Sequence, residues 1–453
     1  MSILLRGWYL MLSLIKLNPV FGSVLNQNPF KATQNPLVRL PGKYNDAPEY
    51  LGINGDILSK HILLIGGTGT GKTNLIFSIV SQLKASLKPN DVLIVFDTKG
   101  DYTRAFGKKE DYFLGNPNNN PCTIVTWNIF GDILADGTTP NSIDSNINEI
   151  SWSIFKPSID KSKDPFFPNA ARELFGGILQ CMTQNGINNP NYKTKYLNNS
   201  ELKEAFSQSS IQDIIKMIER YPQISSVLNF IGDGSSDQAL GVYAELLACV
   251  KKIFINRFAG KGDFSIRNFV REKGGKTLFI DYDISIGNVL SPIYSLLFDL
   301  ALKESLGRSV SQGNVYLVFD EFKLLPSLQH IEDGVNFGRG LGVKVIAGIQ
   351  SIHQLLEAYG ESGGKNILAG FSTMFAFKTN DPDTRKYVTN HFGENMVVES
   401  FRTITNTITE ERRVMHVVED WDINSLNLGE AIVGFPFCKP FKFAFDQFKT
   451  SGL

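Results

Sequence analysis

The chain has 453 residues, of which 42% are hydrophobic and 20% charged, so it can bury a large core and is expected to form two or three domains. Its 45 lysines and arginines balance 45 aspartates and glutamates, which excludes a global basic field as the basis of nucleic-acid binding and leaves only local patches. The four cysteines are widely spaced and lack the Cys-x-x-Cys pattern, which argues against a zinc site or a disulfide framework.

The first 25 residues form the most apolar stretch outside the predicted strands. Only nine uncharged residues separate Arg6 from Lys16, about half of the ~20 that a membrane-spanning helix requires, so this stretch is not expected to span a bilayer. No clean small-x-small cleavage site follows, which argues against a secretory signal. Two interpretations stay open: a helix at a membrane interface or on a partner, and a terminal helix packed on the body of the protein.

Short runs rich in β-branched and aromatic residues predict several strands. The runs are continuous rather than alternating, which is typical of strands buried on both faces of a parallel sheet. Segments with helical spacing lie between them, which predicts a three-layer α/β fold. The predicted strands are residues 61–65, 91–97, 123–127, 277–281, 314–320, 343–349 and 373–378, and the predicted helices among them are 72–87, 291–307 and 351–359.

The strand pattern stops between residues 127 and 277. Helical patterns fill this interval, with Leu174, Ile178 and Met182 on one helix face, so we predict an all-α insertion. The helical patterns cover residues 169–184, 201–221 and 239–256. The expected domains are an N-terminal segment at 1–45, a nucleotide-binding domain at 46–144 and 263–453, and the insertion at 145–262.

The sequence GGTGTGKT, which follows the first predicted strand, matches the phosphate-binding pattern Gly-x4-Gly-Lys-Ser/Thr. Its glycines let backbone N–H groups point at a phosphate, Lys72 supplies a positive charge, and Thr73 offers a hydroxyl to Mg²⁺. The helix that follows adds its positive end. We therefore predict ATP and Mg²⁺ as cofactors. The residues predicted to bind the nucleotide are Gly66, Gly67, Thr68, Gly69, Thr70, Gly71, Lys72 and Thr73.

The sequence NVYLVFDEF places Asp320 and Glu321 at the carboxyl end of a predicted strand. The first carboxylate can hold Mg²⁺, and the second can orient and deprotonate an attacking water, which favours hydrolysis over phosphoryl transfer to a substrate. A competing segment, FDTKGD at 96–101, fits the Asp-x-x-Gly pattern of GTPases. The guanine-reading Asn-Lys-x-Asp is missing, however, because the nearest string is KTND at 378–381.

Two further polar residues stand where the γ-phosphate could be sensed. Gln350 follows the predicted strand 343–349, which a parallel sheet would place beside the strand that ends at Asp320, so its amide could contact the phosphate or the attacking water. Arg339 lies on the turn before that strand. From its sequence position alone, Arg339 fits a solvated surface arginine as well as a functional one.

Several motifs together resemble one known family. In chain order, GGTGTGKT, FDTKGD, DPFFPNAAREL, FSIRNFV, LVFDEFKLLPSL, FGRGLGVKVIAGIQSIHQL and NDPDTRKYVTNHFG resemble the DNA-binding ATPase domain of type IV secretion coupling proteins, over residues 45 to 445. The resemblance implies a RecA-like P-loop ATPase, related to the FtsK and HerA motors, that is interrupted by an all-α domain. It also implies a hexameric ring that moves single-stranded DNA or a nucleoprotein toward a conjugation channel.

The resemblance also implies roles for individual residues and partners. It assigns Lys72 to the phosphates, Asp320 to the metal together with the P-loop threonine, Glu321 to the attacking water, and Gln350 to γ-phosphate sensing. Arg339 falls where the family has an arginine that reaches the nucleotide of the neighbouring subunit. The implied partners are a relaxase and secretion-channel components, and the implied location is the cytoplasm, at the inner face of the membrane.

The sequence departs from this family in two ways. Relatives usually begin with two membrane-spanning helices, whereas this chain is expected to reach the membrane through a partner or through its first 25 residues, or to act as a soluble motor. Its basic residues form only small clusters, at 251–257 and 271–276. Two alternative functions stay open: a receptor or adaptor that recruits protein effectors, and a HerA-like DNA-processing motor unrelated to secretion.

Overall fold

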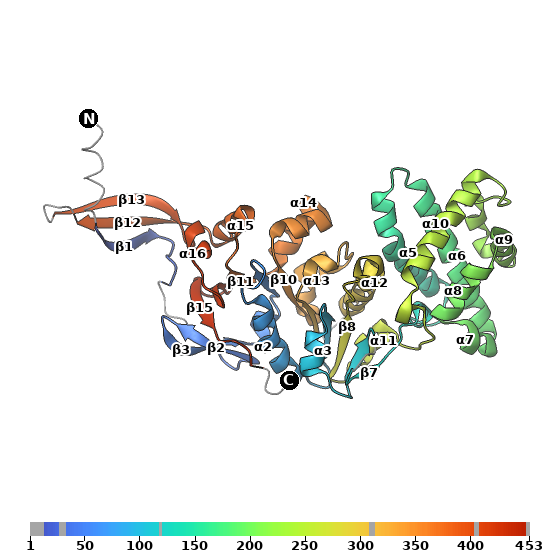
Figure 1. The fold of residues 1–453 in the computed structure, drawn as a ribbon, viewed down its shortest axis with the longest axis horizontal. Coiled ribbons are helices and arrows are strands. Elements are labelled where there is room, and N and C mark those ends of the chain that lie inside the picture. The colour runs from blue at the N-terminus through green and yellow to red at the C-terminus, as the bar shows by residue number, and fades with distance from the viewer. Residues whose placement is uncertain (1–12, 27–32, 117–119, 308–312, 403–406, 450–453) are drawn as a thin grey trace. The chain divides into compact units, whose positions relative to one another are not determined.

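The computed structural model describes residues 13–26, 33–116, 120–307, 313–402 and 407–449 (Figure 1). The chain folds into two compact units, which are described separately. The described residues of unit 1 lie within 13–83, Ile346–Glu357 and Leu368–Lys449. Those of unit 2 lie within Lys84–Val345 and Ala358–Ile367.

Unit 1 is organised around strand β4 (Ile62–Ile65), whose four residues are all buried. β4 pairs in parallel with β10 (Val343–Ile349) on one side and with β11 (Thr373–Phe377) on the other. Antiparallel strands continue the sheet from β11. In spatial order they are β14 (Glu430–Gly434), β15 (Phe441–Phe445), β2 (Val38–Tyr44) and β3 (Ala47–Ile53). The helices that begin in this unit are α1 (Gly55–Leu58), α2 (Lys72–Ala85), α14 (Ile352–Gly370), α15 (Pro382–Phe392) and α16 (Asp420–Asn424).

A separate antiparallel sheet in unit 1 joins the beginning of the chain to its C-terminal part. It contains β1 (Ser13–Phe21), β12 (Glu394–Arg402) and β13 (Ile408–His416), with β12 in the middle. The expected helix in residues 1–25 is therefore wrong for Ser13–Phe21, because backbone pairing with a distant strand overrides the local apolar pattern. Residues 1–12 lie outside the described residues. Among the described helices, none combines the length and the hydropathy that crossing a bilayer demands.

Unit 2 contains a parallel sheet that is covered by α12 (Gly287–Leu306). The order is β9 (Val315–Phe319), β5 (Val92–Asp97), β8 (Lys276–Asp281), β6 (Tyr112–Leu114) and β7 (Thr123–Ile124). Phe298 of α12 packs edge-on against Phe96 and Phe319, with ring centroids 5.6 and 4.9 Å away. The shorter helices are α3 (Asp101–Phe106), α4 (Ile129–Ile133), α11 (Ile266–Glu272) and α13 (Ile331–Phe337).

The helical part of unit 2 agrees with the expected all-α insertion. Between residues 125 and 275, all of which are described, the structure contains helices and turns but no strand, and Leu174, Ile178 and Met182 are buried. The predicted helix at 201–221 is wrong in one respect: it is broken before Ser210, whose side chain forms a capping box with Asp213. The helices are α5 (Pro140–Lys161), α6 (Phe166–Asn188), α7 (Pro190–Tyr196), α8 (Asn199–Gln208), α9 (Ile211–Glu219) and α10 (Asp237–Ile253).

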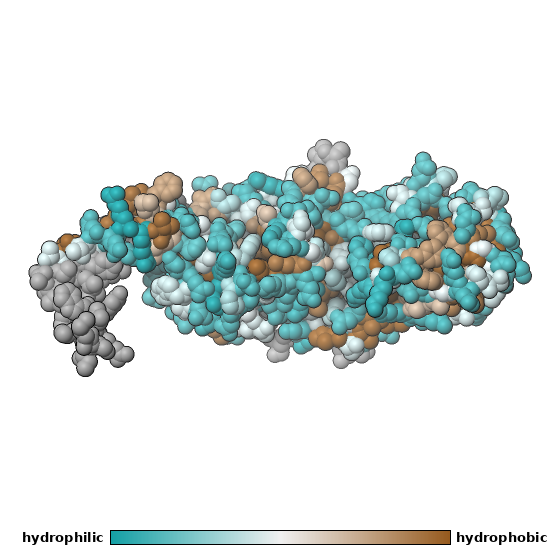
Figure 2. All heavy atoms as spheres, turned by 90° about the horizontal axis from the view of Figure 1, so that it is seen from above, coloured by the Kyte–Doolittle hydropathy of each residue, from teal (hydrophilic) through white to brown (hydrophobic). Residues whose placement is uncertain are grey.

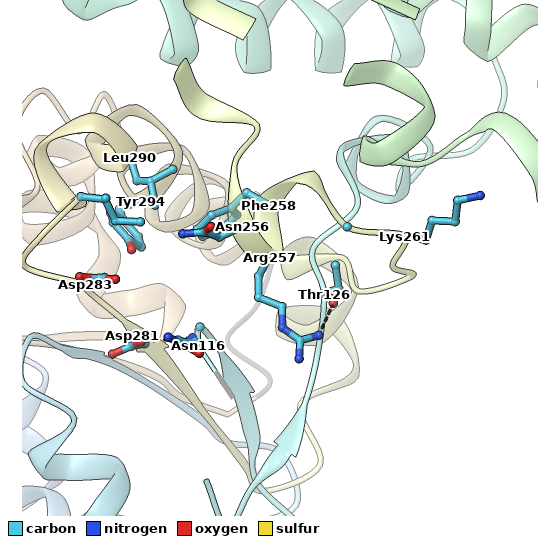
Figure 3. Close-up of a pocket in the computed structure, with 13 residues that line it drawn as sticks. Asn116, Thr126, Asn256, Arg257, Phe258, Lys261, Asp281, Asp283, Leu290 and Tyr294 are labelled. Atoms are coloured by element: carbon cyan, nitrogen blue, oxygen red, sulfur yellow. Dashed lines mark hydrogen bonds between the residues drawn. The ribbon is translucent and has the colours of Figure 1, made fainter. Parts of the chain in front are cut away.

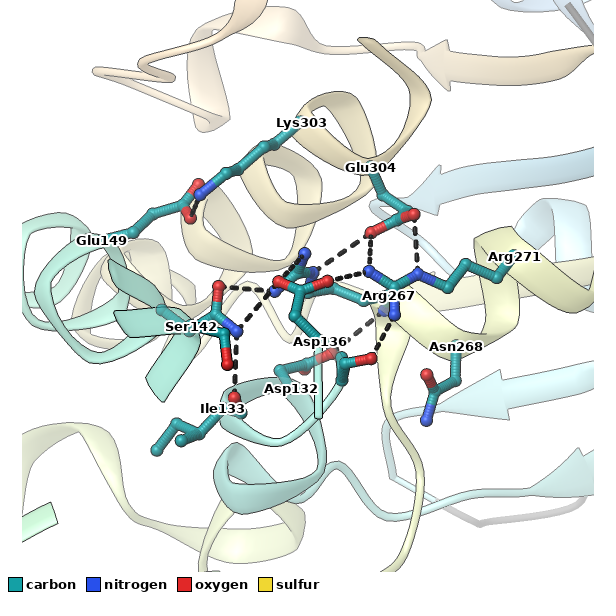
Figure 4. A network of polar contacts seen from close by, with 12 residues as sticks. Asp132, Ile133, Asp136, Ser142, Glu149, Arg267, Asn268, Arg271, Lys303 and Glu304 are labelled. Atoms are coloured by element: carbon teal, nitrogen blue, oxygen red, sulfur yellow. Dashed lines mark hydrogen bonds and ion pairs between the residues drawn. The ribbon is translucent and has the colours of Figure 1, made fainter. Parts of the chain in front are cut away.

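A buried network of polar contacts connects α5, α11 and α12 (Figure 4). The side chain of Arg267 is only 5% exposed and lies 2.6 Å from Asp136 and 3.2 Å from Glu304. Its Nη1 donates a hydrogen bond to Asn146 at 2.7 Å. Arg271 also pairs with Asp136 and Glu304, so this arginine of the basic cluster at 271–276 belongs to the network.

Hydrophilic side chains cover most of the face shown in Figure 2, and hydrophobic ones form separate patches. Large exposed hydrophobic side chains come from both units, such as Phe21 and Trp421 in unit 1 and Leu240 and Ile284 in unit 2.

Replacing Arg267 by alanine should lower the free energy of unfolding by about 1–3 kcal/mol, because Asn146 would lose a hydrogen-bond donor and Asp136 and Glu304 would keep only Arg271 as an ion-pair partner. Chemical denaturation measures this change. Arg104→Ala is the control, because the Arg104 side chain is 61% exposed beside Asp101 and its removal should cost less than about 1 kcal/mol. Equal losses in the two variants would contradict a structural role for the network.

Candidate functional site

The predicted P-loop connects β4 to α2 and forms a tight turn. Gly71 has φ +117, a conformation that side chains rarely adopt. A Cβ atom at Gly71 would lie 3.2 Å from the Cα of Gly429, and one at Gly66 would lie 2.6 Å from the Cβ of Phe377. Both positions therefore require glycine, because neighbouring chain segments pack closely against the loop.

The side chain of Lys72, the first residue of α2, reaches into this loop. Its side chain is buried, and its Nζ donates hydrogen bonds to the carbonyl oxygens of Gly66 at 2.6 Å and Gly67 at 2.8 Å. The hydroxyl of Thr70 donates to the same Gly67 carbonyl at 2.8 Å. These bonds hold the ammonium group inside the curve of the backbone, where it can attract a phosphate.

A cavity of about 400 Å³ adjoins the P-loop within unit 1. One wall comes from the loop and the start of α2, including Lys72 and Thr73. The other wall is the C-terminal segment, which Asn74 fixes through its contacts with Asp446 and Phe448. The residues that this segment contributes are Leu428, Gly429, Phe445 and Gln447. No local motif marks these residues, so they could not be predicted from the sequence.

Gln350 lies beside the P-loop, because β10 pairs with β4, the strand that precedes the loop. β10 pairs with β4 so that Ile349 is opposite Ile65, and the N–H of Gly66 donates to the Ile349 carbonyl at 3.2 Å. The hydroxyl of Thr68 donates to the Gln350 Oε1 at 3.2 Å. The structure thus brings the Gln350 side chain to the phosphate-binding loop.

The acidic pair lies in unit 2, immediately after β9. Phe319 is opposite Phe96 of β5, so Asp320, which follows β9, and Asp97, the last residue of β5, lie at the same edge of the sheet. Burial raises the pKa of Tyr102 well above its ordinary value, and the charge of Asp320 and a hydrogen bond with that carboxylate raise it further. The Glu321 Oε1 lies 3.6 Å from the Nζ of Lys323.

Asp97, in the competing FDTKGD segment, has a structural partner. Its Oδ2 accepts hydrogen bonds from the N–H and the hydroxyl of Thr103, both at 2.8 Å. Asp97 is fully buried, and these bonds fix the turn that leads into α3. The carboxylate therefore anchors a helix at the edge of the sheet.

Arg339 lies in a single 3-10 turn, Gly338–Leu341, in unit 2. The residue is exposed, and so is Phe337 one residue before the turn, at 71%. Of the predicted site residues, Gln350 therefore lies with the P-loop in unit 1, and Asp320, Glu321 and Arg339 belong to unit 2.

A second cavity, of about 520 Å³, lies in unit 2 at the carboxyl end of β8 (Figure 3). Asp281 and Asp283 line one side of it, and Arg257 lies across from them, where it donates a hydrogen bond to Thr126 at 3.4 Å. Burial raises the pKa of Asp281 to about 6, and the charges of Asp97 and Asp283 add to the increase, while the Asn116 N–H opposes it.

The raised pKa of Asp281 makes stability depend on pH. A carboxyl group that binds its proton more tightly in the folded state stabilises the fold at low pH and loses this contribution as the pH rises through about 6. Asp281→Asn should therefore raise the free energy of unfolding at pH 7.5, by on the order of 1 kcal/mol, and change it little at pH 4. Denaturation at both pH values measures this, and equal effects at the two would contradict it.

A sequence model described as the type IV secretion-system coupling protein DNA-binding domain matches residues 51–447. The coupling protein TraD of Escherichia coli K12 is 22% identical over 343 residues, which cover 74% of this chain and 44% of TraD. The coupling protein VirD4 of Bartonella quintana is 22% identical over 420 residues, 87% of this chain and 63% of VirD4. The chain thus spans less than two thirds of these relatives.

Solved structures show the same fold. The conjugative coupling protein TrwBΔN70 matches with a TM-score of 0.71 and 21% identity, covering 96% of this chain and 94% of TrwBΔN70. TrwB in complex with ADP and Mg²⁺ matches with a TM-score of 0.69 and 20% identity, covering 96% of this chain and 95% of TrwB. These matches confirm the predicted fold class: a RecA-like α/β P-loop fold with an all-α insertion.

Proposed function

Since the chain belongs to the type IV secretion-system coupling protein family, we propose that it is an ATP-hydrolysing motor that moves DNA or nucleoprotein toward a type IV secretion channel. The single observation that supports this best is the P-loop itself. Its lysine is buried within the loop, a cavity of about 400 Å³ adjoins it, and Gln350 contacts it. This arrangement suits a nucleoside triphosphate.

The residues present fit the two expected cofactors. Lys72 offers an ammonium group to the phosphates, and Thr73, which lines the same cavity, offers a hydroxyl oxygen of the kind that Mg²⁺ accepts as a ligand. A relative of the same fold, TrwB, is described in complex with ADP and Mg²⁺. When bound, Mg²⁺ supplies charge neutralisation for the phosphates.

Each remaining residue has a distinct proposed role in hydrolysis. Asp320 holds the metal, and Glu321 orients the attacking water and accepts its proton. Gln350 contacts the γ-phosphate or that water, and its contact with Thr68 supports this role. We propose further that residues 46–144 and 263–453 bind the nucleotide and that residues 145–262 form an inserted all-α domain.

We propose further that the chain works as a ring, with a hexamer as the expected size. Arg339 is exposed on its turn, so it is accessible to a neighbouring copy of the chain. An arginine supplied to the neighbour's nucleotide contributes about 10³–10⁵ to the hydrolysis rate in other phosphate-transferring systems. Activity would then depend on assembly.

The proposed partners are single-stranded DNA, a relaxase and secretion-channel components, and the proposed location is the cytoplasm at the inner face of the membrane. The family's description as a DNA-binding domain supports the first partner. The three-stranded sheet has an exposed apolar row, formed by Phe21, Met396 and Val414, which are opposite one another. This row supports a proposed peripheral contact with the membrane.

Two variants separate nucleotide binding from turnover. Lys72→Ala should abolish ATP binding, because it removes the charge that reaches into the P-loop. Glu321→Gln should keep ATP affinity and lower turnover by about 10²–10⁴, because it removes only the general base. Titration with a fluorescent nucleotide and a phosphate-release assay measure the two quantities. Lys439→Ala, at an exposed lysine of unit 1, is the control, and equal loss of binding in the two active-site variants would contradict the roles.

Single-stranded DNA should stimulate ATP hydrolysis by the whole chain. The stimulation should fall steeply as salt rises, since binding that releases counterions weakens with salt concentration. Phosphate release measured with and without an oligonucleotide over a salt series tests this. If DNA has no effect at low salt while a protein cargo stimulates hydrolysis, the chain acts as a receptor for proteins instead.

A further inference from the structure

The segment that follows β11 touches both the P-loop and the residues around Gln350. The carbonyl of Lys378, the first residue after β11, accepts a hydrogen bond from the N–H of Gly67 at 2.8 Å. Asp381 then caps α15 by accepting from the N–H of Thr384 at 3.2 Å and from its hydroxyl. This is the start of the motif NDPDTR, to which the proposed hydrolysis assigns no role.

Side chains hold three consecutive residues, Gln350, Ser351 and Ile352. The N–H of Gln350 donates to the side chain of Gln354 at 3.1 Å. The hydroxyl of Ser351 donates to Asp381 at 2.9 Å, and the N–H of Ile352 donates to the hydroxyl of Thr384 at 3.1 Å. The backbone on the C-terminal side of Gln350 is therefore fixed by two side chains from α15 and its cap.

Burial and charge strengthen the hydrogen bonds that Asp381 and Thr384 make with residues 351 and 352. Thr384 is fully buried, so the geometry of its hydroxyl is fixed by packing as well as by hydrogen bonds. The pKa of Asp381 is lowered: burial alone would raise it, but hydrogen bonds from Thr384 and Ser351 outweigh this effect. Asp381 is thus a carboxylate at neutral pH, and ionised acceptors form stronger hydrogen bonds than neutral ones.

We propose that Asp381 and Thr384 are positioning residues, which hold the backbone after Gln350 so that its side chain stays against Thr68 of the P-loop. This inference rests on the proposed role of Gln350 in hydrolysis. The pair does not touch the nucleotide in this proposal. Instead, the pair orients the Gln350 side chain, which does contact the nucleotide. The hydrogen bond from the Gly67 N–H to the Lys378 carbonyl connects the segment that contains Asp381 to the P-loop.

The test compares Thr384→Val and Ser351→Ala with wild type in the full chain, using phosphate release and ADP binding. Each variant removes one hydroxyl: that of Ser351, which bonds to Asp381, or that of Thr384, which bonds to the Ile352 N–H. We expect kcat to fall about tenfold, which corresponds to the loss of about 1.4 kcal/mol of transition-state stabilisation. The Kd for ADP should stay within about twofold, since the P-loop is unchanged, and Thr384→Ser should restore kcat because it restores the hydroxyl.

Two comparisons distinguish positioning from general damage to the fold. In a Gln350→Ala background, Thr384→Val and Ser351→Ala should lower kcat no further, because residues that act as a unit are not additive. Asp383→Asn is the matched control: this exposed carboxylate lies on the same helix, and its hydrogen bond goes to His353, at 2.8 Å, rather than to Gln350, Ser351 or Ile352. Its kcat should match wild type.

Full additive losses in the Gln350→Ala background would overturn the inference, as would wild-type kcat in both Thr384→Val and Ser351→Ala. If Thr384→Val fails to fold, Ser351→Ala, at a half-buried residue, decides the question. A wild-type chain that does not hydrolyse ATP, with or without DNA, would overturn the proposed function as well. An active wild type with unaffected variants overturns only the positioning role.

Discussion

The parallel pairing of β4 with β10 and β11 is the constraint on which the chemistry of unit 1 depends. Three parallel strands end at the same edge, so the residues that follow them must meet there. The P-loop follows β4, Gln350 follows β10, and Lys378 follows β11. The contacts between the loop and both neighbours are a direct result of register, and Gly66 must be a glycine because Phe377 of β11 approaches it so closely.

Much of this architecture could be predicted, because its signals are local. Continuous apolar runs predicted β4, β5, β8, β9, β10 and β11 to within about one residue at each end, and the glycine pattern predicted the P-loop. Other features depend on pairing between distant segments. The strand at Ser13–Phe21 follows from its pairing with β12, and the cavity wall at Leu428 and Phe445 follows from the fold of the C-terminal segment, so neither has a signal in its own residues.

Several basic residues of unit 2 are paired with carboxylates of the same unit. Arg267 and Arg271 share Asp136 and Glu304, and Lys303 pairs with Glu149, so these three basic groups are already engaged within the chain. Counts of lysine and arginine therefore overstate the positive charge that is free to meet a polyanion. A basic surface for DNA would have to be assembled from residues outside this network, or from several copies of the chain.

The three-stranded sheet gives the N-terminal part of the chain an importance that its sequence does not suggest. β12 is the central strand, hydrogen-bonded to β13 on one side and to β1 on the other. Trimming the protein after Phe21 would strip β12 of one neighbour and leave a row of backbone amides and carbonyls open to other molecules. Truncated proteins would then associate with one another through the unpaired edge of β12. This self-association would be difficult to tell from ring formation.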